Sequence, residues 1–328
     1  MTARDVSRRL LDVRDRVIAG EELSHAEGVD LLKLQGIAVQ DLMAAAAHVR
    51  EHFKGRRVHL CAIVNAKSGG CPEDCGFCAQ SVHNQAEITE FPMIAADAMV
   101  DAARNAQAAG ARCFGIVTSG RSVSDDELDT VCDAVRTIRA ELDILPDASL
   151  GLLTEDMARK LKDAGLNGYH HNIETAPSYY PHVCTTHASG ENLETLRLAK
   201  RHGFTVCSGG VFGIGETREH RVEMAEVLRD EGIDRVCLNF FMPVRGTRFE
   251  DAPPLTPMEI LKTIAVYRLF FPEKDVNVCA GREMHLGDLQ GMIFSAGASA
   301  TMLGDYLTQK GRPARDDLRM LRDLELTW

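Results

Sequence analysis

Residues 205–241 read TVCSGGVFGIGETREHRVEMAEVLRDEGIDRVCLNFF, and this stretch holds the pattern that decides the fold. An apolar run at 205–212 is followed by an amphipathic run at 218–231, by Gly232, and by a second apolar run at 235–241. Short apolar runs predict strands buried on both faces, and the longer run predicts a helix that crosses between two parallel strands. Glycine just past a helix is typical of a C-terminal cap. The stretch therefore predicts a strand–helix–strand unit.

The same alternation recurs along the chain from residue 58. Further strands are expected at 58–64, 113–118, 148–153, 168–173, 276–280 and 300–303. Further helices are expected at 94–109, 125–141, 155–164, 191–202, 257–271 and 286–296. Eight such units predict an α/β fold of the closed (β/α)8, TIM-type class. The alternative is an open doubly wound sheet, but no GxGxxG motif follows the first strand.

Three parts of the chain are expected. Residues 1–57 should form a helical N-terminal extension, because apolar residues such as Val6, Leu10 and Val13 recur there at helical spacing. Residues 58–309 should form the barrel, and the charged tail at 310–328 should pack against one end of it.

Composition narrows the function. The chain has 328 residues, a net charge of −11 and ten cysteines. The acidic balance argues against a nucleic-acid or anionic-membrane partner, and no run approaches the ~20 apolar residues of a spanning helix. The polar residues 1–11 lack a signal-peptide pattern, so a cytoplasmic location is expected. In a reducing compartment many cysteines indicate metal binding or redox chemistry rather than disulfides.

The loop after the first expected strand carries three closely spaced cysteines. Residues 66–80 read AKSGGCPEDCGFCAQ, which places Cys71, Cys75 and Cys78 in a C-x3-C-x2-C spacing. Thiolates are the standard ligands of iron–sulfur clusters, and three of them on a four-iron cluster leave one iron open. A zinc site is the alternative, but structural zinc normally has four ligands and only His83 follows closely. Loops at this end of a barrel usually carry the chemistry.

The spacing, in this place, resembles the signature of the radical S-adenosylmethionine (SAM) superfamily. The resemblance implies a [4Fe-4S] cluster whose open iron binds the amino and carboxylate groups of SAM. It also implies reductive cleavage of SAM to a 5′-deoxyadenosyl radical, which removes hydrogen from unactivated carbon. Phe77 matches a position near the adenine, although it could equally be a packing aromatic.

Four further stretches resemble the biotin synthase family within this superfamily. They are CPEDC at 71–75, YHHNIET at 169–175, VCSGGVFGIGET at 206–217 and AGRE at 280–283. The resemblance covers residues 50–325 and implies two hydrogen abstractions from dethiobiotin, each consuming one SAM. It implies that sulfur from an auxiliary iron–sulfur cluster traps each carbon radical and closes the ring of biotin.

The resemblance also implies roles for single residues. Asn172 and Glu174 would hold the ribose hydroxyls of SAM and the ureido ring of the substrate, with Glu174 where the family usually has Asp. Asn239 and His170 would contact dethiobiotin, and Val211 would touch the adenine. The alternatives are loop-capping hydrogen bonds for the polar residues and a core position for Val211.

The auxiliary cluster of the family departs from its usual form here. The family uses three cysteines and one arginine, and only Cys207 and Arg282 match; the other two positions fall near Phe114 and Asp147. Alternate strands of a barrel supply the same interior layer, so cysteines on strands one, five and seven could face one point. We therefore predict a four-iron auxiliary cluster bound by Cys61, Cys184, Cys207 and Cys279, near Arg282.

The remaining cysteines and the partners complete the prediction. Cys113, Cys132 and Cys237 are interpreted as packing residues, with Cys237 as a possible substitute for Cys184. The resemblance implies reduced flavodoxin or ferredoxin as electron donor and a homodimer. Two alternatives stay open: another radical enzyme on this scaffold, such as a maturase or mutase, and a non-catalytic zinc or iron–sulfur binding protein.

Overall fold

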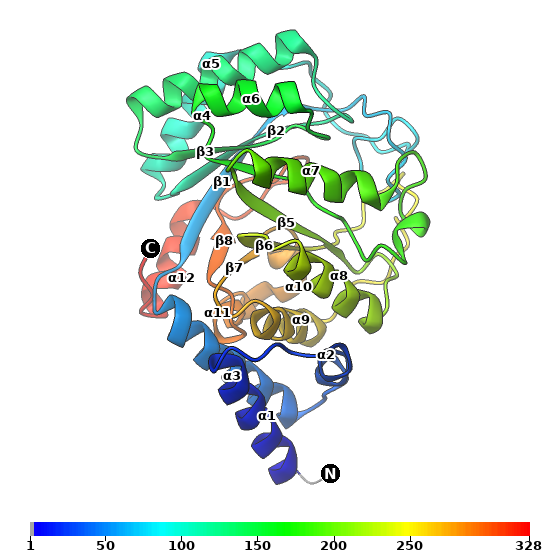
Figure 1. Cartoon of the computed structure of the whole chain (residues 1–328), viewed down its shortest axis with the longest axis vertical. Coiled ribbons are helices and arrows are strands. Elements are labelled where there is room, and N and C mark those ends of the chain that lie inside the picture. The colour runs from blue at the N-terminus through cyan, green and yellow to red at the C-terminus, as the bar shows by residue number, and fades with distance from the viewer. Residues whose placement is uncertain (1–2) are drawn as a thin grey trace.

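The computed structural model describes residues 3–328 and contains a closed barrel of eight parallel strands in chain order (Figure 1). The strands are β1 His59–Lys67, β2 Cys113–Thr118, β3 Leu145–Ser149, β4 Gly168–His170, β5 Thr205–Phe212, β6 Arg235–Phe240, β7 Asp275–Val278 and β8 Ala300–Met302. Closure is made by β1 pairing with β8, in a register that places Cys61 opposite Met302. The predicted (β/α)8 class is confirmed.

Helices follow the strands and cover the outside of the barrel (Figure 1). They are α4 Ala96–Ala108, α5 Asp125–Glu141, α6 Glu155–Ala164, α7 Ser189–Arg201, α8 Arg218–Asp230 and α9 Pro257–Phe270. Helix α5 begins at a capping box: the Ser124 hydroxyl accepts from the backbone N–H of Glu127 at 3.3 Å, and the Glu127 carboxylate accepts from the N–H of Ser124 at 2.9 Å. The capping box and the start of the apolar inner face thus indicate the same first residue for this helix.

Three helices precede the barrel: α1 Ala3–Ile18, α2 His25–Leu32 and α3 Ile37–Lys54. They pack beneath the barrel at its α8–α9 side, where α3 contacts α1 and α9 (Figure 1). Helix α9 is buried on all sides from Ile260 to Phe270 because the barrel covers one face and these helices cover the other. The expected helical N-terminal segment is present; its separation as a domain stays a prediction.

Several expected elements differ from the structure, and strands β4 and β7 end at His170 and Val278 rather than at 173 and 280. Strand β3 ends at Ser149 instead of extending to 153, because its pairing with β2 runs from Leu145 to Ser149 and the chain then turns at Gly151. The helix expected at 286–296 is broken into α10 Arg282–Leu286, the 3-10 turn η2 Gly287–Leu289 and α11 Met292–Ser295. Gly287, with a φ of 49°, ends α10.

The C-terminal tail forms α12 Ala314–Asp323 and returns to the start of β1. Thr327 pairs with the backbone at Arg56 and Val58, and its carbonyl accepts from the Val58 N–H at 2.7 Å. Asp317 lies fully buried against Arg282, with Nη1–Oδ1 and Nη2–Oδ2 distances of 2.8 and 2.9 Å. A bidentate ion pair therefore fastens α12 to the segment after β7.

Replacing Asp317 with alanine is expected to lower the free energy of unfolding by about 3–5 kcal/mol, because it leaves most of a buried guanidinium uncompensated. Asp316 is the matched control: its ion pair with Arg319 spans 3.7 Å between partly exposed side chains, so Asp316→Ala should cost less than about 1 kcal/mol. Anaerobic denaturant unfolding measures both. Equal losses for the two variants would contradict the assignment of Asp317 as the fastening residue.

Candidate active site

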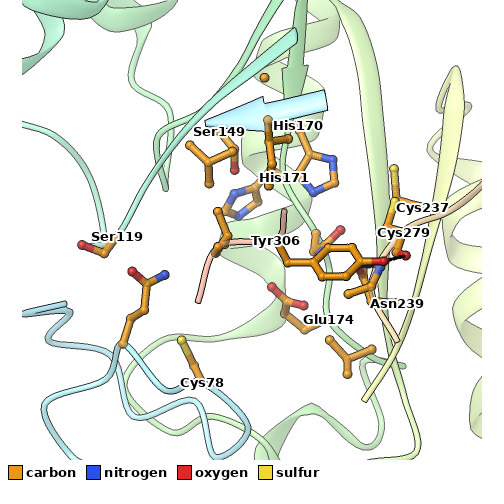
Figure 2. A pocket seen from close by; sticks show the side chains of 18 of the residues that line it. Cys78, Ser119, Ser149, His170, His171, Glu174, Cys237, Asn239, Cys279 and Tyr306 are labelled. Carbon is orange, nitrogen blue, oxygen red and sulfur yellow. Dashed lines mark hydrogen bonds between the residues drawn. The ribbon is translucent and has the colours of Figure 1, made fainter. Parts of the chain in front are cut away.

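One cavity of about 460 Å³ opens at the C-terminal ends of the strands and extends into the barrel. Its wall includes the loop after β1 at one end and interior residues of β1, β5, β6 and β7 at the other. Figure 2 shows Cys78 apart from the pair Cys237 and Cys279, with Glu174 between them. The cavity therefore has a thiol-rich mouth and a thiol-rich floor.

The mouth is formed by the loop that the sequence marks as a cluster site. Cys71, Cys75 and Cys78 all line the cavity, and all are free thiols. The side-chain amide of Asn84 holds the loop by donating to the carbonyls of Cys75 and Cys78 at 3.1 and 2.8 Å. Burial raises the pKa of the Cys78 thiol to about 11, so ionisation at neutral pH needs a cation nearby. Three soft donors within eight residues of one loop, all lining the cavity, fit an iron–sulfur cluster with one open iron.

Asn172 and Glu174 in the loop after β4 each have one buried side-chain oxygen without a hydrogen-bond partner among the described residues. These atoms are Asn172 Oδ1 and Glu174 Oε2, and both residues line the cavity. An unpaired buried polar atom is costly, so such atoms indicate a ligand with hydroxyl or N–H donors. The predicted pair is thus brought together, in the part of the cavity between the two thiol groups.

The position of Glu174 depends on a close approach between two chain segments. Glu174 has a φ of 65°, and its carbonyl accepts from the N–H of Val211 at 2.8 Å. A Cβ at Gly210 would lie 2.4 Å from that carbonyl oxygen. Gly210 is therefore required by the β4 loop itself, because no larger residue allows the contact.

Burial raises the pKa of Glu174 from 4.5 to about 7. The neutral carboxyl stabilises the fold at low pH, and this contribution is lost as the pH rises towards about 7 and the buried group ionises. In the absence of SAM, the melting temperature of Glu174→Gln relative to the parent should therefore be higher at pH 8 than at about pH 5.5. The exposed Glu87→Gln serves as control and should show no such difference. A pH-independent effect of Glu174→Gln would contradict the raised pKa.

An apolar patch lies beside the mouth. Phe77 packs against a cluster formed by Val183, Val211, Ile214 and Phe241. Phe77, Val211 and Phe241 also line the cavity. The structure thus brings the two predicted adenine-contacting residues together on one surface that a flat aromatic ring can cover.

The two other predicted substrate residues lie deeper. The Asn239 amide donates to the Gly210 carbonyl at 3.3 Å, and its oxygen accepts from the Ala280 N–H at 3.3 Å. His170 is half-buried and contacts Cys237; burial opposes its charged form, but the hydrogen bond with the thiol raises its pKa. Both residues line the cavity, so both can reach a bound molecule, and Asn239 is fixed by the backbone on either side.

The floor gathers cysteines from β1, β5 and β6 and from the residue that directly follows β7. Cys207, Cys237 and Cys279 are buried together, and Cys61 packs against them with Met302 and Tyr306. All four thiols line the cavity. The predicted members Cys61, Cys207 and Cys279 therefore do meet. Cys237, which the sequence analysis interpreted as a packing residue with a possible ligand role, occupies the fourth position.

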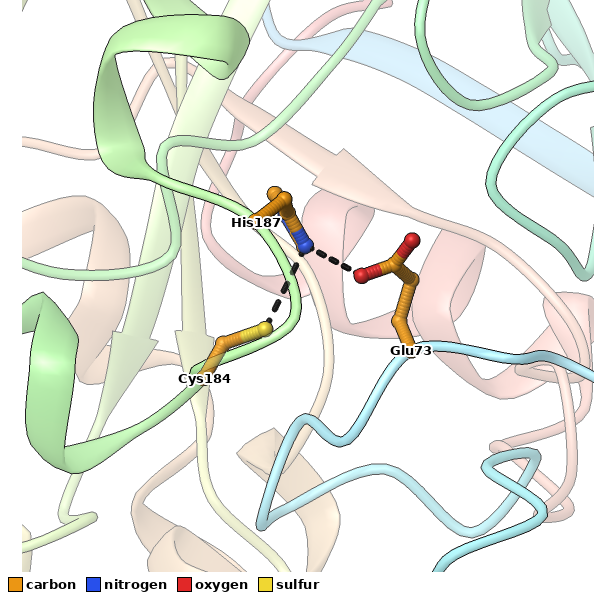
Figure 3. Close-up of side chains that lie close together, drawn as sticks. All are labelled: Glu73, Cys184 and His187. Carbon is orange, nitrogen blue, oxygen red and sulfur yellow. Dashed lines mark hydrogen bonds and ion pairs between the residues drawn. The ribbon is translucent and has the colours of Figure 1, made fainter.

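Cys184 does not join this group, and the predicted four-cysteine set needs this correction. Cys184 lies beside Cys75 at the mouth, and this contact lowers its pKa to about 4. His187 Nδ1 lies 3.3 Å from Cys184 Sγ and 2.5 Å from Glu73 Oε2 (Figure 3). The ligand atoms of these three residues lie within 4.8 Å of one another. They already satisfy one another, and they join the cluster loop to the segment after β4.

Arg282 does not line the cavity wall, because it lies past the end of β7 on α10 and is engaged by Asp317. Its Nη2 also lies 3.5 Å from the carbonyl of Met302, which packs with the floor cysteines, so its place near the auxiliary cluster stays a prediction. The guanidinium at the floor belongs to Arg235, which donates to Asp147 at 2.9 Å and lies 3.8 Å from Cys207 Sγ. The sequence analysis missed Arg235. The signal was available, because Arg235 is two residues before Cys237 on the same face of β6.

Known proteins share the sequence and the architecture of this chain. The sequence model of the Radical SAM superfamily matches residues 66–228, and that of the Biotin and Thiamin Synthesis associated domain matches residues 237–327. The chain is 50% identical over 315 residues to the biotin synthase of Citrifermentans bemidjiense, covering 96% of both chains. It is 52% identical over 320 residues to that of Syntrophotalea carbinolica, covering 97% of this chain and 98% of the relative.

The chain belongs to the biotin synthase family. It is a radical SAM enzyme of that family, with the cysteine triad inside the superfamily segment. Cys237 and Cys279 fall in the associated domain, so the floor is assembled from both matched segments.

Solved structures agree on the fold. Methylornithine synthase superimposes with a TM-score of 0.84 at 22% identity, covering 96% of both chains. The FeFe-hydrogenase maturase HydG from Carboxydothermus hydrogenoformans gives 0.81 at 19% identity, covering 98% of this chain and 80% of the maturase. At these identities the likeness shows the barrel architecture alone. Among the residues that the structure describes, no helix is long and apolar enough to cross a membrane.

Proposed function

We propose that this chain converts dethiobiotin to biotin by radical SAM chemistry, with sulfur supplied from a second cluster inside the barrel. The observation that carries the proposal is one cavity with three thiols at its mouth and a packed group of four at its floor, where Cys113 on β2 also lines the wall. Sulfur insertion needs a radical generator and a sulfur source on either side of one substrate. The unpartnered oxygens of Asn172 and Glu174 lie along that cavity.

The mouth residues would hold the radical-generating group. Cys71, Cys75 and Cys78 would ligate three irons of a [4Fe-4S] cluster, which leaves the fourth for the amino and carboxylate groups of SAM. Phe77 and Val211 would bind the adenine on their apolar patch. Asn172 and Glu174 would accept hydrogen bonds from the ribose hydroxyls, which supplies their missing partners.

The floor residues would hold the sulfur source. Cys61, Cys207, Cys237 and Cys279 form a four-thiolate set, the ligand number of a four-iron cluster. With these groups bound, the radical cluster and SAM supply a 5′-deoxyadenosyl radical and the auxiliary cluster supplies sulfide. The Arg235 guanidinium next to Cys207 would offset part of the negative charge that four thiolates bring.

The substrate would lie between the two ends. Asn239 can donate to and accept from a cyclic urea through its amide, and the backbone of Gly210 on β5 and of Ala280 after β7 fixes its orientation. His170 would contact the reacting end of the molecule, since it also touches Cys237. The barrel wall excludes water from the radical. Overall, each biotin formed consumes two SAM and releases two methionines and two 5′-deoxyadenosines.

The electron donor, the oligomeric state and the location are proposed from the resemblance to the family. We propose reduced flavodoxin or ferredoxin as electron donor, a homodimer as the working form, and the cytoplasm as location. All ten cysteines are free thiols, which suits a reducing compartment in which seven of them are proposed to bind iron.

Incubation of the iron-loaded, reduced protein with SAM and dethiobiotin under anaerobic conditions tests the proposal. Biotin should form, with two 5′-deoxyadenosines per biotin. A maturase or mutase on the same barrel would cleave SAM without producing biotin. Absence of biotin from protein that carries both clusters and cleaves SAM would overturn the assignment.

A further inference from the structure

Asn277 lies at the centre of the floor cysteines. It is on β7, opposite Cys237 of β6 in the register, and is 6% exposed. Its Nδ2 lies 3.4 Å from Cys61 Sγ and 3.9 Å from Cys237 Sγ. Its backbone carbonyl accepts from the Cys279 thiol at 3.9 Å. One residue therefore touches three of the four thiols.

The orientation of the Asn277 amide has a physical cause. A thiolate on iron can only accept hydrogen bonds, so the NH2 group must face the sulfurs. The structure has this orientation, and the opposite atom, Oδ1, is buried with no partner among the described residues. A leucine of similar shape would avoid that cost. The cost of the unpaired Oδ1 is therefore offset by the hydrogen bonds that the amide N–H groups donate to the sulfurs.

The other donors at the floor are less free. Arg235 reaches Cys207 at 3.8 Å, but its Nη1 also donates to Asp147 at 2.9 Å. His170 forms a hydrogen bond with Cys237 and with no other floor thiol in the described structure. Asn277 is thus the residue that joins Cys61 on β1 to Cys237 on β6, two strands that do not pair with each other.

We propose that Asn277 is the positioning residue of the auxiliary cluster and that its N–H···S hydrogen bonds raise the reduction potential of that cluster. Hydrogen bonds to cluster sulfurs withdraw electron density and so favour the reduced form. The inference rests on the proposed function, because it needs a cluster at the floor. It assigns to the neutral amide of Asn277 the role of setting how readily the auxiliary cluster accepts an electron as that cluster loses sulfide.

Three substitutions separate hydrogen bonding from packing. Asn277→Leu keeps the branched shape and removes the donor. Asn277→Asp keeps the shape and places a carboxylate against the thiolates. Asn277→Gln keeps the donor. Asn65→Leu is the matched control, because the Asn65 amide donates to the Leu307 carbonyl at 2.8 Å, away from the floor cysteines.

The test is an anaerobic potentiometric titration of the iron-loaded protein, followed by electron paramagnetic resonance, with the radical SAM cluster as internal reference. At a fixed potential, Asn277→Leu should lower the ratio of reduced to oxidised auxiliary cluster about tenfold, which is 59 mV for a one-electron couple. Asn277→Asp should lower it further, whereas Asn277→Gln and Asn65→Leu should stay near the parent. The ratio for the radical SAM cluster should not change in any variant.

The outcomes distinguish this inference from the proposed function. If the parent protein binds iron and sulfide for only one cluster, the auxiliary site itself fails. If both clusters are present and Asn277→Leu leaves the ratio unchanged, or Gln changes it as much as Leu, the role of the amide is overturned. If Leu and Asp lose the auxiliary iron while Gln keeps it, the amide donor is required to hold the cluster, which supports the positioning role.

Discussion

Replacement of Cys71, Cys75 or Cys78 with alanine will abolish formation of 5′-deoxyadenosine from SAM by the reduced protein. Each thiol lines the mouth of the cavity, and the loop after β1 carries no other cysteine; Cys184, from the segment after β4, lies beside Cys75 and is engaged by Thr186 and His187. Removal of one thiolate leaves the iron cluster with two ligands from the loop, so the cluster should not persist. Chromatography of the reaction mixture gives the measurement, and the expected yield is that of a sample without protein.

Cys132→Ala is the control for these three variants. Cys132 is buried on the barrel side of α5 and does not line the cavity, so its removal should leave both iron content and SAM cleavage close to the parent. If a triad variant still cleaved SAM at the parent rate, the mouth would not be the radical-generating site.

Replacement of Cys237 with alanine will separate the two halves of the reaction. Cys237 lies with Cys207 and Cys279 at the floor, and the triad lies at the mouth. The variant should lose the iron and sulfide of the auxiliary cluster, about half of the total for two four-iron clusters. It should still form 5′-deoxyadenosine, but it should form no biotin. Iron and sulfide counting together with product analysis measures the separation.

Cys184→Ala is the matched comparison, because the sequence analysis assigned Cys184 the place that Cys237 occupies. Its thiol contacts Cys75, Thr186 and His187, so the variant should keep the iron of the floor cluster. Any loss should instead concern the mouth. Loss of the auxiliary iron in Cys184→Ala, with full auxiliary iron in Cys237→Ala, would restore the original four-cysteine set.

The barrel was predictable from the sequence because each strand–helix unit repeats the same pattern. Continuous apolar strands, amphipathic helices and terminal glycines all point to parallel strands buried on both faces. The cysteine triad was predictable for a different reason. Its three ligands lie within eight residues of one loop, so their meeting depends on local chain geometry and not on tertiary packing.

The floor was predictable only in part. Cys61 and Cys207 lie on strands and Cys279 directly follows β7, so their inward direction follows from the two-residue period and the layering of the barrel. The same period applied to β6 places Cys237 on the face of Asn239, a residue already assigned to the interior. Cys184 lies in the loop after β4, where no period applies and only tertiary contacts with Glu73 and His187 decide its place.

Arg282 illustrates the other limit. It follows Cys279 by three residues and so shares the end of β7, but the strand stops at Val278 and Gly281 adopts a φ of 89°. The chain then turns into α10 and directs the guanidinium to Asp317. Strand end and turn direction were not visible in the sequence pattern, so Arg282 was assigned to the floor. Arg235 and Asn277 were missed although each lies two residues before a floor cysteine, Cys237 and Cys279 respectively.

The most direct test of the account uses dethiobiotin that carries deuterium on the carbons to which sulfur is added. In this account, the cluster bound by the mouth cysteines generates the radical and the cluster bound by the floor cysteines supplies sulfide. Mass spectrometry should then find deuterium in the 5′-deoxyadenosine and sulfur at the same carbons of the product. Biotin formed alongside 5′-deoxyadenosine without deuterium would contradict the account, because the radical would then not act on the substrate.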